Sequence, residues 1–315
     1  MTDPVSRDDI ANAALRIKDH VRRTPVIESG AGTFGLAASL TLKLEELQHS
    51  GSFKARGAFN TLLSSDVPAA GVAAASGGNH GAVVAYAARA LGYPADIFVP
   101  ETSSPAKIAR IRSYGATLHV GGARYADAAE ACARHRETSG AMDIHAYDAP
   151  GTIAGQGTVA LEWLEQSPDL DTVLIAVGGG GLISGCALWL ADKVKVVAVE
   201  PEGSCALHAA LDAGAPVDVP VESVAADSLG AKRCGDLVHR ICASRVSESV
   251  LVGDDAILEA QARLWNEMQV AAEPGGATAL AALVGGAYRP APGERVGVLV
   301  CGGNVDPRTL ARDEA

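Results

Sequence analysis

The pattern with the clearest chemical meaning is a run of four glycines. Residues 178 to 185 read GGGGLISG, follow the apolar run TVLIAV and open a helix-like segment. Glycines let backbone N–H groups approach an anion closely, and a helix N-terminus adds a partial positive charge at the same place. A tight turn alone would need only one glycine. The sequence therefore predicts that this loop binds a phosphate.

A second turn offers another anion site. Residues 76 to 81, SGGNHG, stand between the apolar run GVAAAS and a helical pattern. Consecutive N–H groups, together with the side chains of Ser76, Asn79 and His80, suit a carboxylate or a phenolate oxygen. For His80 taken alone, packing at the start of a helix is the more common role, and acid or base catalysis is the rarer one.

The third feature is Lys54 in the segment SGSFKARGAFN, residues 50 to 60. It is the only lysine of the chain flanked by glycine, serine and an aromatic residue. A lysine attacks aldehydes only when part of it is deprotonated, which desolvation or a nearby positive charge can arrange. We expect Phe53 and Arg56 to provide such a setting. Without the two anion sites, Lys54 would be interpreted as a solvated helix residue.

Two other phosphate-binding motifs do not fit the spacing of the glycine run. A nucleotide P-loop ends in Gly-Lys-Ser/Thr, which is absent here. A dinucleotide fingerprint starting at Gly178 and Gly180 places Ile183 where its third glycine belongs. Glu200 nevertheless ends the next apolar run, about where a ribose-binding acid would stand. A nicotinamide-dependent oxidoreductase therefore remains an alternative.

The elements that must position these residues alternate between strand-like and helical patterns, which is typical of βαβ units and an α/β fold. The strand-like runs cover residues 71–76, 95–99, 116–120, 172–177, 195–200 and 295–300. They are apolar on both faces, as parallel strands between two helix layers are. Residues 104–115 are predicted to form a helix that stops at Gly115. Residues 212–249 show weak periodicity.

The strands fall into two groups, which predicts two domains, each an open, twisted, mostly parallel sheet flanked by helices. We place a small domain at residues 64–147 and a large domain at residues 1–63 and 148–315.

Composition and charge exclude several classes of protein. A net charge of −11 without a basic run makes nucleic acid an improbable partner. The N-terminus has no signal-like apolar core and no stretch reaches about 18 apolar residues, so we expect a cytoplasmic protein and no membrane partner. The six cysteines form no Cys-x-x-Cys pair and no zinc spacing. Five of them are expected to be small buried hydrophobic residues, and Cys301 needs separate treatment.

Lys54, SGGNHG, the glycine run and CGGNVD at 301–306 resemble, in this order, the fold type II pyridoxal phosphate enzymes. The resemblance is to the serine/threonine dehydratase and serine racemase group, and it spans nearly the whole chain. It includes AGQGTVALE at 154–162, VEPEG at 199–203 and AAEPGGATALAAL at 271–283. It implies a tryptophan synthase β-like fold and pyridoxal 5′-phosphate as the cofactor.

The resemblance also implies roles for individual residues. Lys54 would hold the cofactor as a Schiff base, Phe53 would pack on its ring, and Asn79 would contact its 3′-oxygen. Cys301 stands where the family usually has serine beside the pyridine nitrogen. The phosphate would be bound by the backbone of Gly178, Gly179, Gly180, Gly181 and Leu182. The substrate carboxylate would be bound by the backbone of Ser76, Gly77, Gly78, Asn79 and His80.

Departures from the family favour one reaction within it. A neutral thiol at Cys301 favours elimination, with Lys54 taking the α-proton as base. Gly77 stands where serine racemases have a serine base, and Ala206 replaces the aspartate of the racemase cation site that keeps Glu200. Tyr147 and Asp148 resemble the dehydratases. We therefore expect a threonine or serine ammonia-lyase that produces a 2-oxo acid and ammonia, and no metal site.

Several expectations rest on the resemblance alone or stay open. A homodimer is expected, with a small-molecule amino acid as the substrate. The chain ends soon after CGGNVDP, so we expect no C-terminal regulatory domain. Residues 145–150 and 222–240 are expected to border the substrate and to decide which β-hydroxy amino acid is preferred. The alternatives are a serine-type racemase, a dehydratase of another β-hydroxy amino acid, the oxidoreductase, and a binding protein without catalysis.

Overall fold

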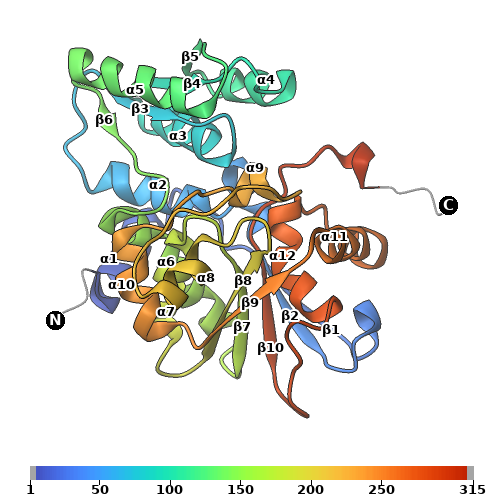
Figure 1. Ribbon diagram of the computed structural model, residues 1–315. Coiled ribbons are helices and arrows are strands. Elements are labelled where there is room, and N and C mark those ends of the chain that lie inside the picture. The colour runs from blue at the N-terminus through green and yellow to red at the C-terminus, as the bar shows by residue number, and fades with distance from the viewer. Residues whose placement is uncertain (1–4, 311–315) are drawn as a thin grey trace.

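The computed structural model describes residues 5–310, and its strands form two separate sheets (Figure 1). In spatial order, the large sheet consists of β1 (Val26–Ser29), β2 (Leu40–Leu44), β10 (Val296–Val300), β7 (Thr172–Ala176), β8 (Lys195–Pro201) and β9 (Glu248–Val252). Only β1 runs antiparallel to its neighbour. Crossovers between parallel strands are made by helices, which cover the sheet faces.

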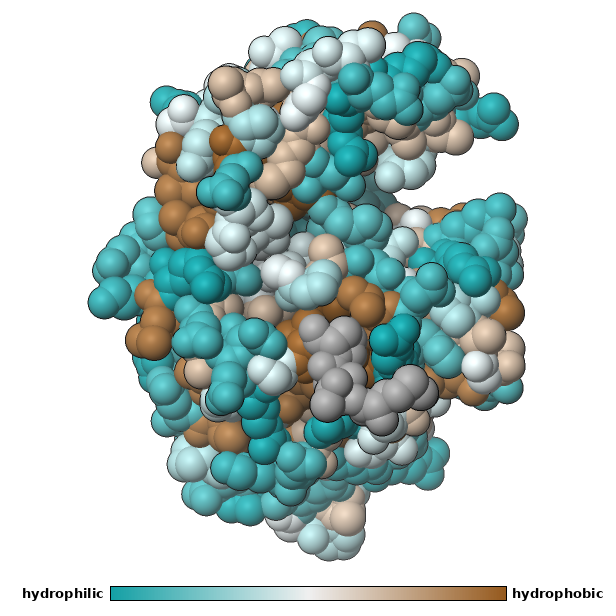
Figure 2. Space-filling view, turned by 90° about the vertical axis from the view of Figure 1, so that its left-hand side faces the viewer, coloured by the Kyte–Doolittle hydropathy of each residue, from teal (hydrophilic) through white to brown (hydrophobic). Residues whose placement is uncertain are grey.

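The small sheet is entirely parallel. Its strands, in spatial order, are β5 (Thr117–Val120), β4 (Ala95–Val99), β3 (Val72–Ala75) and β6 (Met142–Asp143). All four lie within the segment predicted as the small domain, and a deep cleft separates this part from the rest of the molecule (Figure 2). The predicted α/β fold with two parallel-rich sheets is confirmed, while the exact domain boundaries stay a prediction.

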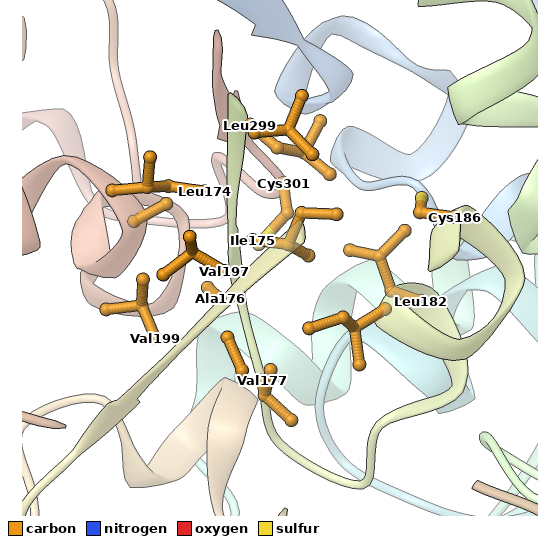
Figure 3. Packing of buried hydrophobic residues seen from close by; sticks show 14 of the residues in the cluster. Leu174, Ile175, Ala176, Val177, Leu182, Cys186, Val197, Val199, Leu299 and Cys301 are labelled. Atoms are coloured by element: carbon orange, nitrogen blue, oxygen red, sulfur yellow. The ribbon is translucent and has the colours of Figure 1, made fainter. Parts of the chain in front are cut away.

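Both faces of the large sheet are covered by helices. Successive side chains of a strand point to opposite faces, and Figure 3 shows Leu174 and Ile175 on opposite sides of β7. Leu182 and Cys186 of α7 pack on the side of Ile175. Every residue of β7 is buried, which is why its sequence has no charged position. The helices around this sheet are α1 (Arg7–Ile17), α2 (Lys54–Leu63), α6 (Pro150–Gln166), α7 (Gly181–Leu190), α8 (Ala206–Ala213), α10 (Asp236–Arg245), α11 (Asp254–Met268) and α12 (Pro274–Val284).

The small sheet is covered less completely. Val72 and Ile97 belong to one core with α3 (Asn79–Leu91), whereas Ala73 and Phe98 pack with α5 (Tyr125–Ser139) on the other face. Its outer strand β5 has exposed residues at both ends. The prediction that all strand-like runs are buried on both faces is therefore wrong for β5, because an edge strand at the rim of a four-stranded sheet keeps its ends open to solvent.

The remaining elements agree with the sequence to different degrees. The predicted helix at 104–115 is α4 (Pro105–Ser113), and Gly115 follows it with a φ of 81°. The weakly periodic segment 212–249 contains the single-turn helix α9 (Ala226–Leu229), α10 and the start of β9. Short 3₁₀ turns at Thr33–Gly35, Glu45–Leu47, His49–Gly51 and Pro307–Thr309 complete the described chain.

Candidate active site

A cavity of about 490 Å³ lies between the two sheets. Part of its wall comes from segments that directly follow strands: residues 76–80 after β3, residues 100 and 102–104 after β4, and Gly179 after β7. In open parallel sheets such a crevice at the carboxyl ends of the strands is where ligands bind. The fold therefore gathers two of the predicted chemical segments, SGGNHG and the glycine run, at one place.

Lys54 is the first residue of α2 and lines this cavity. Its Nζ donates a hydrogen bond to the carbonyl oxygen of Ala146 at 3.3 Å and lies 5.2 Å from the centroid of the Phe53 ring. Burial lowers the pKa of the Lys54 amine to about 8, although Cys301 and Glu273 act in the opposite direction. A measurable fraction of this amine is therefore unprotonated near neutral pH and can act as a nucleophile or a base.

Arg56 does not contribute to that setting, contrary to the sequence-based expectation. Its guanidinium is buried and forms ion pairs with Glu45 at 2.7 Å and Glu162 at 3.1 Å. Lys43 joins the same buried cluster through a 2.5 Å contact with Glu162. The positive charge of Arg56 is thus neutralised beneath α2, and desolvation alone accounts for the lowered pKa of Lys54.

The glycine loop between β7 and α7 is closely covered, and no position in it has room for a side chain. A Cβ at Gly179 would lie 2.2 Å from Cδ1 of Tyr147, and one at Gly180 would lie 2.3 Å from Val238. Gly180 is also the N-cap of α7, with a φ of 89° that favours glycine. The first N–H groups of a helix have no partners within the helix. The loop therefore forms a cradle of bare backbone that fits a phosphate.

Cys301 follows β10 and is buried in a small cavity that adjoins the main one. Phe53, Lys54, Asn79 and residues 178–182 line the same small cavity. The Cys301 thiol donates a 3.4 Å hydrogen bond to the carbonyl oxygen of Gly275. Burial raises the pKa of the Cys301 thiol well above its ordinary value, so this group stays neutral.

All five residues of the predicted carboxylate site, Ser76 to His80, line the main cavity. Ser76 Oγ accepts a hydrogen bond from the Gly78 N–H at 3.2 Å, which shapes the turn. His80 Nε2 lies 2.7 Å from the carbonyl oxygen of Ile144, and burial lowers the pKa of His80 to about 3. A neutral imidazole at that distance must donate from Nε2, so His80 ties the turn to the segment after β6.

The two segments expected to border the substrate do reach the cavity. Ala146 and Tyr147 line it from one segment, and residues 226–228, 230 and 231 line it from the other. Tyr147 also donates from its hydroxyl to the carbonyl oxygen of Arg233 at 3.3 Å, which holds its ring over the glycine loop. Asp148 acts differently, because its carboxylate accepts hydrogen bonds from the first N–H groups of α10, at 3.0 to 3.1 Å.

Sequence reasoning missed further polar residues of the site. Glu273, Asn304 and the ion pair between Lys107 and Asp227 were not singled out, yet they line adjoining cavities. A signal existed for Glu273, because it is the only charged residue in the apolar, glycine-rich segment 271–283. Asn304 and the Lys107 pair are brought to the site by tertiary structure alone.

Other predictions concern cysteines, metals and membranes. The six cysteines are free, and Cys205 is the only one that is not buried. Within residues 5–310 no group of histidine, cysteine, aspartate and glutamate side chains has metal-binding geometry. Glu200 instead accepts hydrogen bonds from the N–H groups of Leu207 and His208 at the start of α8. No helix of the described chain is long and apolar enough to span a membrane.

The site fits pyridoxal 5′-phosphate, because it combines the enclosed Lys54 amine, the bare backbone of the glycine loop and the neutral Cys301 thiol. Comparisons with known proteins agree. The chain is 41% identical over 308 residues to a phenylserine dehydratase of Ralstonia pickettii, covering 96% of this chain and 94% of that protein. It is 36% identical over 313 residues to an L-threonine ammonia-lyase of Thermotoga maritima, covering 98% and 78% respectively. The solved structure of maize serine racemase has a TM-score of 0.91 and 36% identity, covering 97% and 95%. A family profile described as "Pyridoxal-phosphate dependent enzyme" matches residues 17–302. The chain therefore belongs to the pyridoxal-phosphate dependent enzyme family, and its cofactor is pyridoxal 5′-phosphate.

Proposed function

We propose that this protein is an ammonia-lyase that eliminates water from a β-hydroxy amino acid and releases a 2-oxo acid and ammonia. One observation carries the proposal. Three basic side chains line the described cavity, and only Lys54 combines a pKa near neutrality with the absence of an ion pair among the described residues. Lys107 is paired with Asp227, and His80 is held neutral against a backbone carbonyl. A single base at the α-carbon suits elimination better than racemisation.

The geometry of the cavity supports specific roles in binding the cofactor. Lys54 Nζ would hold the cofactor's aldehyde carbon, the backbone of residues 178–182 would bind its phosphate, and Cys301 would lie beside its ring. Pyridoxal 5′-phosphate supplies an electron sink that makes the α-hydrogen of a bound amino acid acidic. The protein's own part is to bind the substrate carboxylate with backbone N–H groups of residues 76–80 and to take the α-proton on Lys54 Nζ. Water leaves in the elimination and is added back in hydrolysis, so the 2-oxo acid and ammonia together balance the substrate.

The charge of the cavity limits the substrate. Apart from Lys54, its one lysine is neutralised by Asp227, and Thr102, Ser103 and Ser104 add only neutral polar groups. A neutral β-substituent is therefore favoured over an acidic one. L-Threonine and L-serine are the first substrates to test, and 3-phenylserine is the next because one relative is named for it. A cytoplasmic homodimer remains the expected setting.

Racemisation is the second candidate, and one observation favours it. A Cβ on Gly77 would lie 2.9 Å from Ser103 Oγ, so the hydroxyl of Ser103 occupies the space beside the missing side chain. A hydroxyl without an adjacent base is a poor proton acceptor at neutral pH. We therefore place racemisation second.

The test uses purified protein loaded with pyridoxal 5′-phosphate. Assays for 2-oxo acid and for the D-amino acid on L-serine, L-threonine and 3-phenylserine separate the two reactions. Replacing Lys54→Ala should lower kcat at least about a thousandfold, because both base and cofactor anchor are lost. Lys193→Ala, at an exposed lysine outside the cavity, is the matched control and should leave kcat unchanged. Formation of the D-isomer without 2-oxo acid would overturn the lyase proposal in favour of the racemase.

A further inference from the structure

Glu273 is a buried carboxyl group in the wall of the cofactor cavity, and the reaction proposed above does not use it. It is the N-cap residue of α12, it is 7% exposed, and its backbone N–H donates to the carbonyl oxygen of Gly302 at 3.1 Å. Phe53, Lys54 and Cys301 line the same small cavity. A buried carboxyl at such a place is costly unless a hydrogen bond or a function compensates for it.

A chain of side-chain amides links Glu273 to a backbone carbonyl. Asn304 Nδ2 donates to the carbonyl oxygen of Ser50 at 3.0 Å and to Asn79 Oδ1 at 2.5 Å. Asn79 Nδ2 in turn donates to Glu273 Oε1 at 2.6 Å. Both polar atoms of the Asn79 side chain are thereby engaged.

The two ends of this chain fix its direction. The carbonyl oxygen of Ser50 can only accept, so Asn304 must turn its NH₂ group toward it and toward Asn79 Oδ1. The acceptor oxygen of Glu273 then faces the NH₂ group of Asn79. A flipped Asn79 amide would place its NH₂ group against that of Asn304 and its oxygen against the carboxylate, and both contacts are repulsive.

We propose that Glu273 is a positioning residue that, together with Asn304, holds the Asn79 amide in one orientation and leaves one Asn79 N–H for the cofactor in the cavity. An NH₂ group has two donors, and Glu273 takes one of them. Asn79 lines both the main cavity and the small one that contains Cys301. The second N–H is therefore available to an acceptor oxygen of a bound cofactor. The inference depends on the cofactor and not on the proposed reaction.

Two glycines leave room for the hydrogen-bonded side chains of Glu273 and Asn304, which is independent support for this arrangement. A Cβ at Gly302 would lie 2.1 Å from Glu273 Oε1, and one at Gly51 would lie 2.2 Å from Asn304 Oδ1. Gly51 also has a φ of 72°, which favours glycine. Any side chain at either position would displace the amide chain.

The charged groups around Glu273 come from several elements. Lys54 faces it from α2, Arg110 from α4, Asp227 from α9, and the neutral Cys301 from the end of β10. Burial raises the pKa of Glu273 to about 7, while the hydrogen bond from Asn79 acts in the opposite direction. In either protonation state Glu273 can present an oxygen that accepts from Asn79, because Asn304 already turns the Asn79 NH₂ group toward it, so the positioning does not require the charge.

The test compares variants by binding of pyridoxal 5′-phosphate to the cofactor-free protein and by the absorption maximum of the bound cofactor. Glu273→Ala and Asn304→Ala should each raise the Kd of the cofactor about tenfold and shift the absorption maximum, because the Asn79 amide can then rotate. The double variant should lose little more than either single one, since both act through Asn79. Glu273→Gln keeps an acceptor oxygen and should bind within about threefold of the parent protein.

Glu294→Ala is the matched control. This carboxylate also accepts several hydrogen bonds, among them those from Tyr288 and the Ala291 N–H, but it lies just before β10, at the end of the sheet away from the site. Its removal should lower the free energy of unfolding and leave the cofactor's Kd and spectrum unchanged. A Glu273→Ala protein with the parent Kd and spectrum would overturn the proposal, and a Glu273→Gln protein as impaired as Glu273→Ala would show that charge, not position, is what matters. Asn304→Ala decides the question if Glu273→Ala does not fold.

Discussion

The two walls of the cavity differ in how tightly they are built. On the wall from the large sheet, a Cβ on Gly179 or Gly180 would overlap packed side chains, and every residue of β7 and β10 is buried. On the wall from the small sheet, a Cβ on Gly77 would meet only the Ser103 hydroxyl closely, and β5 is open at its ends. Dense packing restricts which residue types a position can accept, whereas an open surface tolerates substitutions.

This difference in packing matches a difference among the relatives, which share a cofactor but are named for different substrates. The cofactor is common to the family, and most of the segments that we propose bind it, the glycine loop and Cys301 among them, lie on the dense wall. The relatives are named for different substrates: phenylserine, threonine and serine. We expect substrate preference to depend on the small-sheet side as well as on residues 145–150 and 222–240, because residues 102–104 and Lys107 line the cavity there.

The largest effect should come from breaking the charge cluster under the dense wall. Arg56→Met leaves the buried carboxylates of Glu45 and Glu162 without their shared partner and should lower the free energy of unfolding by about 3 to 5 kcal/mol. Arg89→Met on the small-sheet side removes one exposed 2.9 Å hydrogen bond to Ser113 and should cost less than about 1 kcal/mol. Urea titration measures both. Equal costs would mean that the two sides are equally tolerant.

The next effect concerns the glycines that face the cavity. Gly180→Ala forces a side chain to a φ of 89° and against Val238, so affinity for pyridoxal 5′-phosphate should fall about a hundredfold. Gly77→Ala should change that affinity less than about fivefold, because the Ser103 hydroxyl can rotate away. Fluorescence titration of the cofactor-free proteins gives both constants.

Gly214 provides the control for this pair. It has a φ of 69° at the end of α8, and a Cβ there would meet nothing within 4 Å. Gly214→Ala therefore carries the backbone cost without the overlap, and it should leave cofactor affinity unchanged. If the Gly180→Ala protein binds the cofactor as tightly as the Gly214→Ala protein does, the glycine loop can shift to accommodate a side chain.

The same contrast explains how much could be predicted from sequence. The runs that became β4, β7 and β10 were found within a residue, because full burial leaves a continuous apolar pattern. The two-residue strand β6 and the exposed, irregular segment around α9 carry no such pattern. Their placement depends on tertiary contacts that no local period encodes.

The site follows the same rule. Lys54, the glycine loop and Cys301 stand in motifs whose residue types are dictated by close contact, and they do meet in one cavity. Arg56 was assigned to the wrong setting, because sequence proximity to Lys54 does not say that its side chain turns toward Glu45. Glu273 and Asn304 contact Asn79 from about 200 residues away along the chain. No local sequence pattern indicates these contacts.

The smallest effect should appear in the pH dependence of stability. It should again come from residues on the large-sheet side. Among the described carboxyl groups, those with a raised pKa are Glu46, Glu200 and Glu273, and all three lie outside the small sheet. Burial raises the pKa of Glu46 to about 8, and its buried Oε2 has no hydrogen-bond partner. Between the ordinary value of 4.5 and about 8, the native state keeps a proton that the unfolded state has released. The contribution of Glu46 to stability therefore falls as pH rises through this window.

Glu46→Gln removes that contribution. The free energy of unfolding of the variant, relative to that of the parent protein, should rise by on the order of 1 kcal/mol between about pH 5 and about pH 8.5. The change is smaller than the full pKa shift implies, because an ionised carboxyl can turn toward water. Unfolding of the cofactor-free proteins in urea at the two pH values measures it. Glu130→Gln, at an exposed carboxyl of α5 paired with Arg134, removes the same charge on the small-sheet side and should shift by less than about 0.5 kcal/mol. If the two variants respond alike, the carboxyl of Glu46 is not kept protonated by burial, and the dense wall is more permeable to water than its packing implies.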